Sequence, residues 1–252
     1  TEGGVSVSAL RRRRRGAQAG VTLIEVLISM VVLGIVTAML VQGWMNLQRA
    51  TVTVERTMDA RATGRDAMAR ISSELRASQP TALPTPSGTA MPEPDPPILE
   101  ALPYSVTFYS AYNSSSANAD GSGVAAVRPT RLWLDTATAQ AAPWNPLCKT
   151  LYWQRDMNGN GVFTDPVDRT LPLAFNIANE DVADPINGTA YSPVFRYAYL
   201  DGGDVQWTDD ANSVLSSIVG VSVRLVVNAK MGGTPKYVDT TTTVRLRNAS
   251  RD

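Results

Sequence analysis

Histidine is absent from the 252-residue sequence, and cysteine occurs once, at Cys148. Without histidine, the chain has no Ser-His-Asp or Cys-His nucleophile and no histidine-based zinc site. One cysteine closes no intrachain disulfide and builds no multi-cysteine metal site. The carboxylates show no spacing that singles out an acid/base pair. We therefore predict no catalytic residues and expect that the protein is not an enzyme.

The net charge of the whole chain is zero, because it has 23 basic and 23 acidic residues. These charges are unevenly distributed along the sequence. Five arginines, Arg11–Arg15, precede residues 21–41, where Glu25 is the only charged residue. As a helix this apolar stretch is about 31 Å long, enough to span a bilayer core. The positive-inside rule places the arginines in the cytoplasm. We expect a single-pass anchor with the N-terminus inside and the remainder outside.

Other interpretations fit less well. A nucleic-acid patch would carry aromatic residues among its arginines, and a secretory signal would have a shorter apolar region with an A-x-A-like site. A buried soluble helix seldom begins with five arginines. None of these interpretations explains Glu25, since a carboxylate inside an apolar membrane segment is costly and indicates a functional site.

The sequence Gly20-Val21-Thr22-Leu23-Ile24-Glu25-Val26-Leu27 resembles the class III signal of type IV pilins and type II secretion pseudopilins. The resemblance implies that prepilin peptidase cuts between Gly20 and Val21 and that Val21 is N-methylated. It also implies that Glu25 is a filament-assembly residue. The implied partners are prepilin peptidase, other pilins or pseudopilins, and an inner-membrane assembly platform. The family usually has Phe or Met where this chain has Val21.

Removal of the leader, residues 1–20, takes away five arginines and Glu2. The mature chain then has 18 basic and 22 acidic residues, a net charge of about −4. It therefore lacks the basic surface that nucleic-acid binding requires.

Residues 42–78 are predicted to continue the helix as an amphipathic segment that packs on a sheet. Its apolar positions recur at helical spacing: Leu47, Val54, Met58, Ala62, Met68, Ile71 and Leu75. The sequence Ile71-Ser72-Ser73-Glu74-Leu75-Arg76 resembles the helix end of PilW-like minor pilins and J-type minor pseudopilins. Pro80 ends the helix, and residues 79–103 form a connector in which seven of the sixteen prolines lie between Pro80 and Pro97.

Residues 104–252 are predicted to form a β-rich head, because period-two runs replace the helical pattern. The runs are 104–109, 131–134, 150–154, 194–199, 219–227 and 237–246, the last two joined as a terminal hairpin. The chain is thus expected to be α+β, with a long N-terminal helix on a mostly antiparallel sheet.

Residues 156–168 have oxygen-bearing side chains in the pattern that opens a calcium loop: Asp156, Asn158 and Asn160, with Asp165 or Asp168 to complete the shell. A Gly-rich turn is the preferred interpretation, because two Asn-Gly pairs form turns without a metal. A weak calcium site is the alternative, and no other cofactor is expected.

Together these features predict a minor pilin that helps to initiate or cap a type IV pilus, first in the inner membrane and later at the cell surface. A minor pseudopilin of a type II secretion system is the alternative within the family. An uncleaved, membrane-anchored, calcium-dependent binding protein is the alternative from another class. It would have the anchor but would need neither Gly20 nor Glu25.

Overall fold

A computed structural model describes residues 22–80, 96–111, 127–136, 149–184, 188, 191–230 and 235–246. Gly20, Val21 and Cys148 lie outside the described residues. The chain divides into two units, Thr1–Thr51 and Val52–Asp252, and each is considered by itself.

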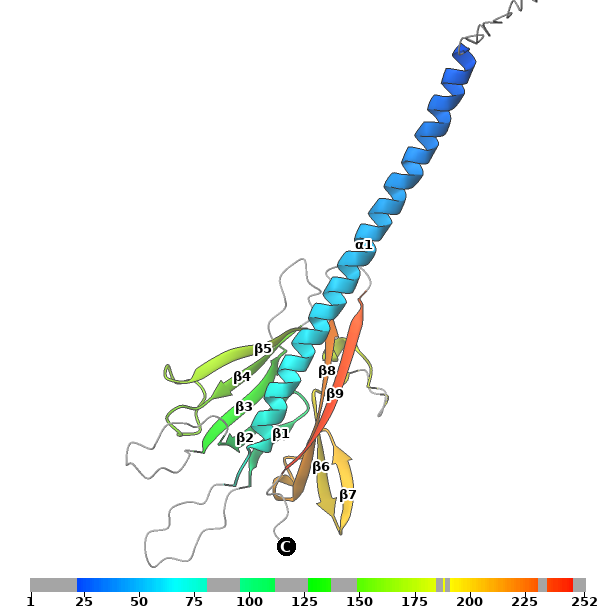
Figure 1. The fold of residues 1–252 in the computed structure, drawn as a ribbon. Helices are drawn as coiled ribbons and strands as arrows, with labels where there is room; N and C mark the ends of the chain where they lie inside the picture. Colours follow the sequence, from blue (N-terminus) through cyan, green and yellow to red (C-terminus); the bar gives the residue numbers. More distant parts are fainter. Residues whose placement is uncertain are drawn as a thin grey trace, which may run out of the picture. The chain divides into compact units, whose positions relative to one another are not determined.

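The helix α1 spans Leu23–Arg76, so it belongs to both units (Figure 1). The sequence predicted its end near residue 78, and the helix stops two residues earlier. The backbone N–H of Ser78 donates to the carbonyl of Leu75 at 3.2 Å, and Ser78 then forms a β-bridge with Ser110. Pro80 follows at once, and proline cannot continue a helix.

The head contains a sheet whose strand pairs are all antiparallel, which confirms the predicted α+β class. The strand order is β1-β2-β3-β4-β5-β8-β6-β7, with β9 paired to β8. The strands are β1 Ile98–Leu102, β2 Ser105–Ser110, β3 Arg128–Asp135, β4 Lys149–Arg155, β5 Arg169–Ile177, β6 Phe195–Asp201, β7 Asp204–Thr208, β8 Ile218–Asn228 and β9 Tyr237–Arg245.

Six strands and the β8–β9 pairing follow the sequence prediction, whereas β1, β5 and β7 were not predicted. The strand β1 lies inside residues 79–103, which were expected to be connector throughout. Its N-terminal end is irregular, because the register with β2 shifts between Ile98 and Glu100. In the sequence, the run 98–102 is short, follows two prolines and shows no clear period-two pattern, so it was not predicted as a strand.

The pairing between neighbouring strands is shortest between β5 and β8. Among the described residues of these two strands, Ile177 and Val227 are the only pair in register. The buried side chain of Asn179 reinforces this junction. Its Oδ1 accepts from the backbone N–H of Val226 at 2.9 Å, and its Nδ2 donates to the carbonyl of Arg224 at 2.9 Å. Asn179 therefore takes the place of further strand pairing between the two halves of the sheet.

In the head, α1 lies over the sheet with a buried face that differs from the predicted one (Figure 1). Val54 is 53% exposed, Met58 is 63% exposed and Ala62 is also exposed. The prediction was therefore wrong for the first half of the apolar stripe and right for its last three members. The apolar face on the sheet consists of the small residues Ala60, Gly64 and Ala67 together with Met68, Ile71 and Leu75.

Small residues let the helix approach the sheet closely. A side chain added at Gly64 would come within 3.3 Å of the Oγ1 of Thr240 in β9. This contact explains why the buried face shifts away from the larger apolar residues, which would hold the helix further from β9.

Glu74 is fully buried between α1 and the sheet. Its Oε2 accepts from the Oγ of Ser110 at 2.7 Å and from Nη2 of Arg155 at 3.1 Å. Nη2 of Arg70 lies 3.2 Å from its Oε1. The guanidinium groups of Arg70 and Arg155 also lie 5.1 and 5.2 Å from the ring centroid of Trp153. Burial lowers the pKa of Arg155, and the charge of Glu74 opposes that shift.

Replacing Glu74 with alanine should strongly destabilise the head, because it leaves the Arg155 cation buried without its anion. We expect a loss of about 3–5 kcal/mol, seen as a fall in Tm of roughly 6–20 °C for the full-length chain in detergent. Glu74→Gln, which keeps the shape, should cost less. Asp66→Ala, at an exposed position of the same helix, serves as the control. Equal melting of Glu74→Ala and the wild type would contradict this role.

Candidate functional site

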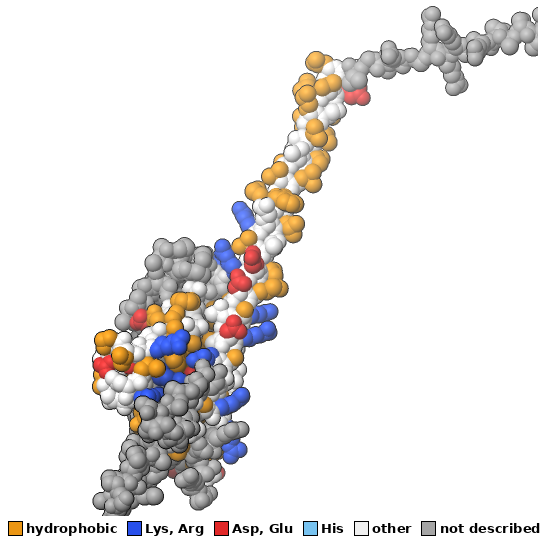
Figure 2. Space-filling model, turned by 60° about the vertical axis from the view of Figure 1, so that its left-hand side comes forward, with side chains coloured by type: hydrophobic (Ala, Val, Ile, Leu, Met, Phe, Trp, Pro, Cys, Tyr) orange, Lys and Arg blue, Asp and Glu red, His pale blue; other side chains and the backbone are white. Residues whose placement is uncertain are grey.

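The part of α1 in the first unit is an apolar helix whose side chains are exposed. Every residue from 22 to 51 is exposed, including Leu33 at 66% and Leu40 at 69%. The most apolar window of α1 has a mean hydropathy of 2.6, and none of it is buried. Figure 2 shows apolar side chains along the length of this segment. By length and composition it can cross a membrane.

The helix begins with a capping arrangement. The backbone N–H of Glu25 donates to the carbonyl of Thr22 at 3.0 Å and lies 3.4 Å from the Oγ1 of Thr22. Thr22 and Glu25 have the spacing of a capping box, and a carboxylate in the first turn is favoured by the helix dipole. This role of Thr22 was not predicted, although the T-x-x-E pattern carries the signal. Capping is therefore a structural reason for an acidic residue at position 25.

Capping leaves the charge of Glu25 without a partner. Within the described part of the chain, no side chain or backbone group is within bonding distance of its carboxylate. No other charged residue occurs between Thr22 and Gln48. In lipid or against apolar helices, a charged carboxylate here is costly unless a cation from outside its own helix segment pairs with it.

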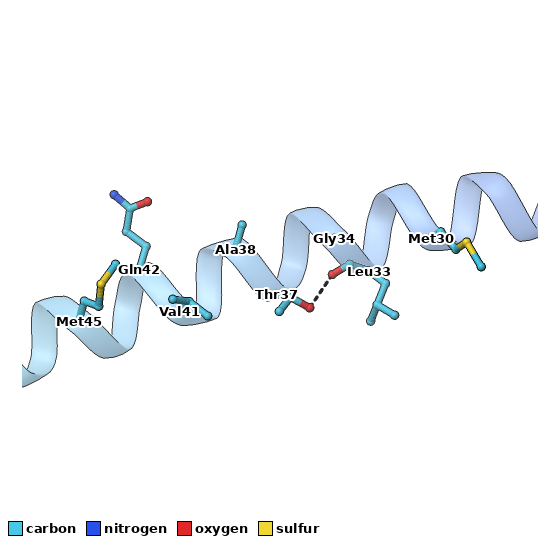
Figure 3. Close-up of a pocket in the computed structure, with 8 residues that line it drawn as sticks. All are labelled: Met30, Leu33, Gly34, Thr37, Ala38, Val41, Gln42 and Met45. Atoms are coloured by element: carbon cyan, nitrogen blue, oxygen red, sulfur yellow. Dashed lines mark hydrogen bonds between the residues drawn. The ribbon is translucent and has the colours of Figure 1, made fainter.

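One face of the same helix is hollowed (Figure 3). The hollow centres on Gly34, where an added Cβ atom would meet no other atom within 4 Å, and on Ala38 one turn later. The Oγ1 hydroxyl of Thr37 donates a hydrogen bond to the carbonyl of Leu33 at 2.8 Å, so its donor is satisfied within the helix. Small residues four apart allow another helix to approach closely in a membrane.

The loop after β4 brings the five predicted calcium ligands close together. Hydrogen bonds from their side chains to the loop backbone and to one another connect them. Oδ1 of Asp156 accepts from the backbone N–H groups of Asn158 and Gly159, and Oδ2 accepts from that of Gly161. The Oδ1 atoms of Asn158 and Asn160 each accept a backbone N–H two residues ahead.

The remaining acidic side chains close the same loop. Oδ2 of Asp165 accepts from the side-chain amides of Asn158 and Asn160, each at 2.7 Å. Asp168 accepts from the backbone N–H groups of Met157 and Asp165. Among the described residues, no three His, Cys, Asp or Glu side chains are grouped as a metal site would require. These hydrogen bonds are enough to hold the loop as a turn without a metal, and each oxygen that accepts a single bond keeps a further lone pair that a cation could use.

The family model for the prokaryotic N-terminal methylation motif matches residues 15–41, which include Gly20, Val21 and Glu25. No curated protein matches the sequence.

The matched motif coincides with the exposed apolar helix and the lone carboxylate, and the same helix continues onto an antiparallel sheet. The combination indicates a structural subunit rather than an enzyme, anchored in a membrane by a single helix. By its N-terminal motif and its α+β fold, this chain is similar to type IV pilin-like proteins.

Proposed function

We propose that this protein is a minor, PilW-like subunit of a type IV pilus that helps to initiate or cap the filament. The observation that carries the proposal is the lone carboxylate of Glu25 within an apolar helix that matches the methylation motif. The motif implies processing by prepilin peptidase and assembly with other pilins. The arginine run supports an orientation with the leader in the cytoplasm and the head outside.

The mechanism is mechanical. The apolar helix is held in the inner membrane, an assembly platform extracts it, and it is buried again among neighbouring helices. Glu25 then pairs with the positively charged amino group of Val21 in an adjacent subunit, which compensates both charges in the apolar filament core. The hollow at Gly34 and Ala38 suits the same packing, because it lets a second helix approach.

A minor pseudopilin of a type II secretion system is the second candidate. It is favoured by the sequence from Ile71 to Arg76, which resembles J-type minor pseudopilins as closely as PilW-like pilins. Identification of the adjacent genes would separate the two, since each system has its own assembly ATPase and outer-membrane channel.

Prepilin peptidase should cut between Gly20 and Val21. Intact-mass and N-terminal analysis of protein from its native envelope should show loss of residues 1–20 and one added methyl group on Val21. Gly20→Leu should retain the arginine run, whereas the matched leader variant Gly16→Leu should be cut normally. A mature N-terminus at any other residue would contradict the assignment.

Glu25 should act in assembly through its charge. Glu25→Gln keeps a side chain that suits the capping box and removes the charge, whereas Glu25→Ala removes both. We expect both variants to insert and fold normally, and to enter filaments about tenfold less, because the neighbouring amino group is left unpaired. Normal incorporation of Glu25→Gln, with a defect only in Glu25→Ala, would show that Glu25 is a helix cap and nothing more.

The calcium alternative makes a prediction that the turn interpretation does not. At a calcium concentration tenfold above Kd, binding would stabilise the full-length protein by about 1.4 kcal/mol, a rise in Tm of roughly 3–6 °C over chelator. Asp156→Ala should abolish that rise, while the exposed control Asp201→Ala should keep it. Equal Tm values with calcium and chelator would assign the loop to the turn alone.

A further inference from the structure

Within the described residues, β7 is an unprotected edge of the sheet. It pairs with β6 alone among the described strands, and a turn at Gly202 and Gly203, both with positive φ, joins the two. In Figure 1, β7 lies at the margin of the head, on the outer side of β6. Edge strands are often protected by lysine, proline or a bulge, which discourage pairing with another chain. The strand β7 contains neither lysine nor proline, and its register with β6 has no shift.

The edge presents the backbone groups of Val205 and Trp207. In a hairpin with a two-residue turn, the residues beside the turn form a hydrogen-bonded pair, which here is Asp201 with Asp204. Antiparallel partners alternate along a hairpin between hydrogen-bonded and non-hydrogen-bonded pairs. The pairs that contain Val205 and Trp207 are therefore non-hydrogen-bonded. These two residues consequently direct their N–H and C=O groups away from β6.

Apolar side chains flank these backbone groups on one face of the hairpin. Leu200 pairs with Val205, and Ala198 pairs with Trp207, so all four side chains share a face. Leu200 is 39% exposed, Val205 is 55% exposed and Trp207 is 45% exposed. Unpaired backbone groups beside exposed apolar side chains are the features that bind an added strand.

The tip of the hairpin has uncompensated charge. Asp201 and Asp204 are exposed and lie directly opposite each other, an arrangement of like charges that destabilises a strand pair. Neither forms a salt bridge with any residue that the structure describes. Further along the hairpin, by contrast, Oδ1 of Asp209 lies 2.7 Å from Nε of Arg196. The tip therefore offers two carboxylates to a cation from another molecule.

We propose that β7 binds an extended segment of a different protein, which adds to the sheet as an antiparallel strand. The segment has apolar residues opposite Trp207 and Val205 and a basic residue opposite Asp204, an apolar–x–apolar–basic pattern. Its backbone completes the hydrogen bonds of Val205 and Trp207, and its basic side chain compensates the opposed carboxylates. The inference goes beyond the proposed function, because it concerns the head alone and requires no filament.

A second copy of β7 does not supply such a segment. Two antiparallel β7 strands centred on Gln206 would place Asp204 of each copy opposite Thr208 of the other. That arrangement brings no cation to either pair of carboxylates. The charge of the tip therefore favours a basic segment of another protein over a β7–β7 dimer.

Peptide binding to the full-length protein in detergent, measured by fluorescence anisotropy, tests the proposal. The labelled probe acetyl-TVTVKT-amide places its valines opposite Trp207 and Val205 and its lysine opposite Asp204. We expect saturable binding with a Kd below about 1 mM. The control acetyl-TVTVET-amide should bind about fivefold more weakly, because its glutamate meets the two carboxylates. Absence of binding by the lysine peptide would overturn the proposal.

Substitution at Val205 separates backbone pairing from contact with the apolar side chains. Val205→Pro removes an N–H group that points away from β6, so the hairpin keeps its own hydrogen bonds and the protein its Tm. Peptide binding should nevertheless weaken about tenfold, because the added strand loses a donor. The matched variant Val205→Thr keeps the donor and the shape and should bind within about threefold of the wild type. Equal binding by Val205→Pro and Val205→Thr would contradict a strand on this edge.

Amide hydrogen exchange, resolved by NMR, requires no substitution. In the protein alone, the N–H groups of Val205 and Trp207 should exchange faster than those of Gln206 and Thr208, which bond to β6. Saturating peptide should slow the first two about tenfold and leave the other two nearly unchanged. Bound peptide without this protection would rule out strand addition. Slow exchange at Val205 in a dimeric protein without peptide would place a second copy on the edge and overturn the choice of partner.

Charge exchange tests the basic residue of the segment. Asp201→Lys with Asp204→Lys should reverse the preference between the two peptides, because the tip is then basic. Asp59→Lys with Asp66→Lys, at exposed positions of α1, is the matched control and should leave the preference unchanged. A preference that Asp201→Lys with Asp204→Lys does not reverse would overturn the assignment of a basic partner. These measurements use purified protein, so their failure would leave the proposed pilus function untouched.

Discussion

The exposed apolar surface of α1 between Leu23 and Met45 is the constraint on which the rest of this protein depends. No described residue of the chain covers that surface, and in water each large apolar side chain would be unfavourable. The helix is therefore stable only in lipid or among other apolar helices. Both environments allow a helix because its backbone groups bond within the segment. An anchor that is later buried in a filament satisfies this constraint in both locations.

The head places a different demand on the same helix. From Ala60 to Leu75 the helix needs a face that fits a sheet, and small residues provide it by letting β9 approach Gly64. Glu74 adds specificity, because sliding or rotating the helix would separate its buried carboxylate from Arg155 and Ser110 of the sheet. A purely apolar contact would allow the helix to slide more easily. The head is thereby held in a defined register on the helix.

The packing of α1 on the sheet also decides which of its side chains in the head stay exposed. Because Ala60 and Gly64 face the sheet, Met58, Arg61 and Arg65 must face away from it. The incomplete junction between β5 and β8 leaves a groove beside Val52 and Glu55. The groove and the exposed face of α1 therefore both follow from how α1 packs on the sheet. A change in that packing, such as loss of the Glu74 ion pair, would disturb both surfaces.

Sequence alone was enough to predict the features that depend on neighbouring residues: the apolar helix with Glu25, the end of the helix before Pro80, and six of the nine strands that the structure describes. Local periodicity and local charge are sufficient for these. The buried face of α1 was settled only by the tertiary structure, because helical spacing alone fits both Val54–Met58 and Ala60–Gly64. The same is true of the pairing of Glu74 with Arg155, which are 81 residues apart. Such pairs form when strands distant in the sequence pack against the helix, and no local sequence pattern indicates that packing.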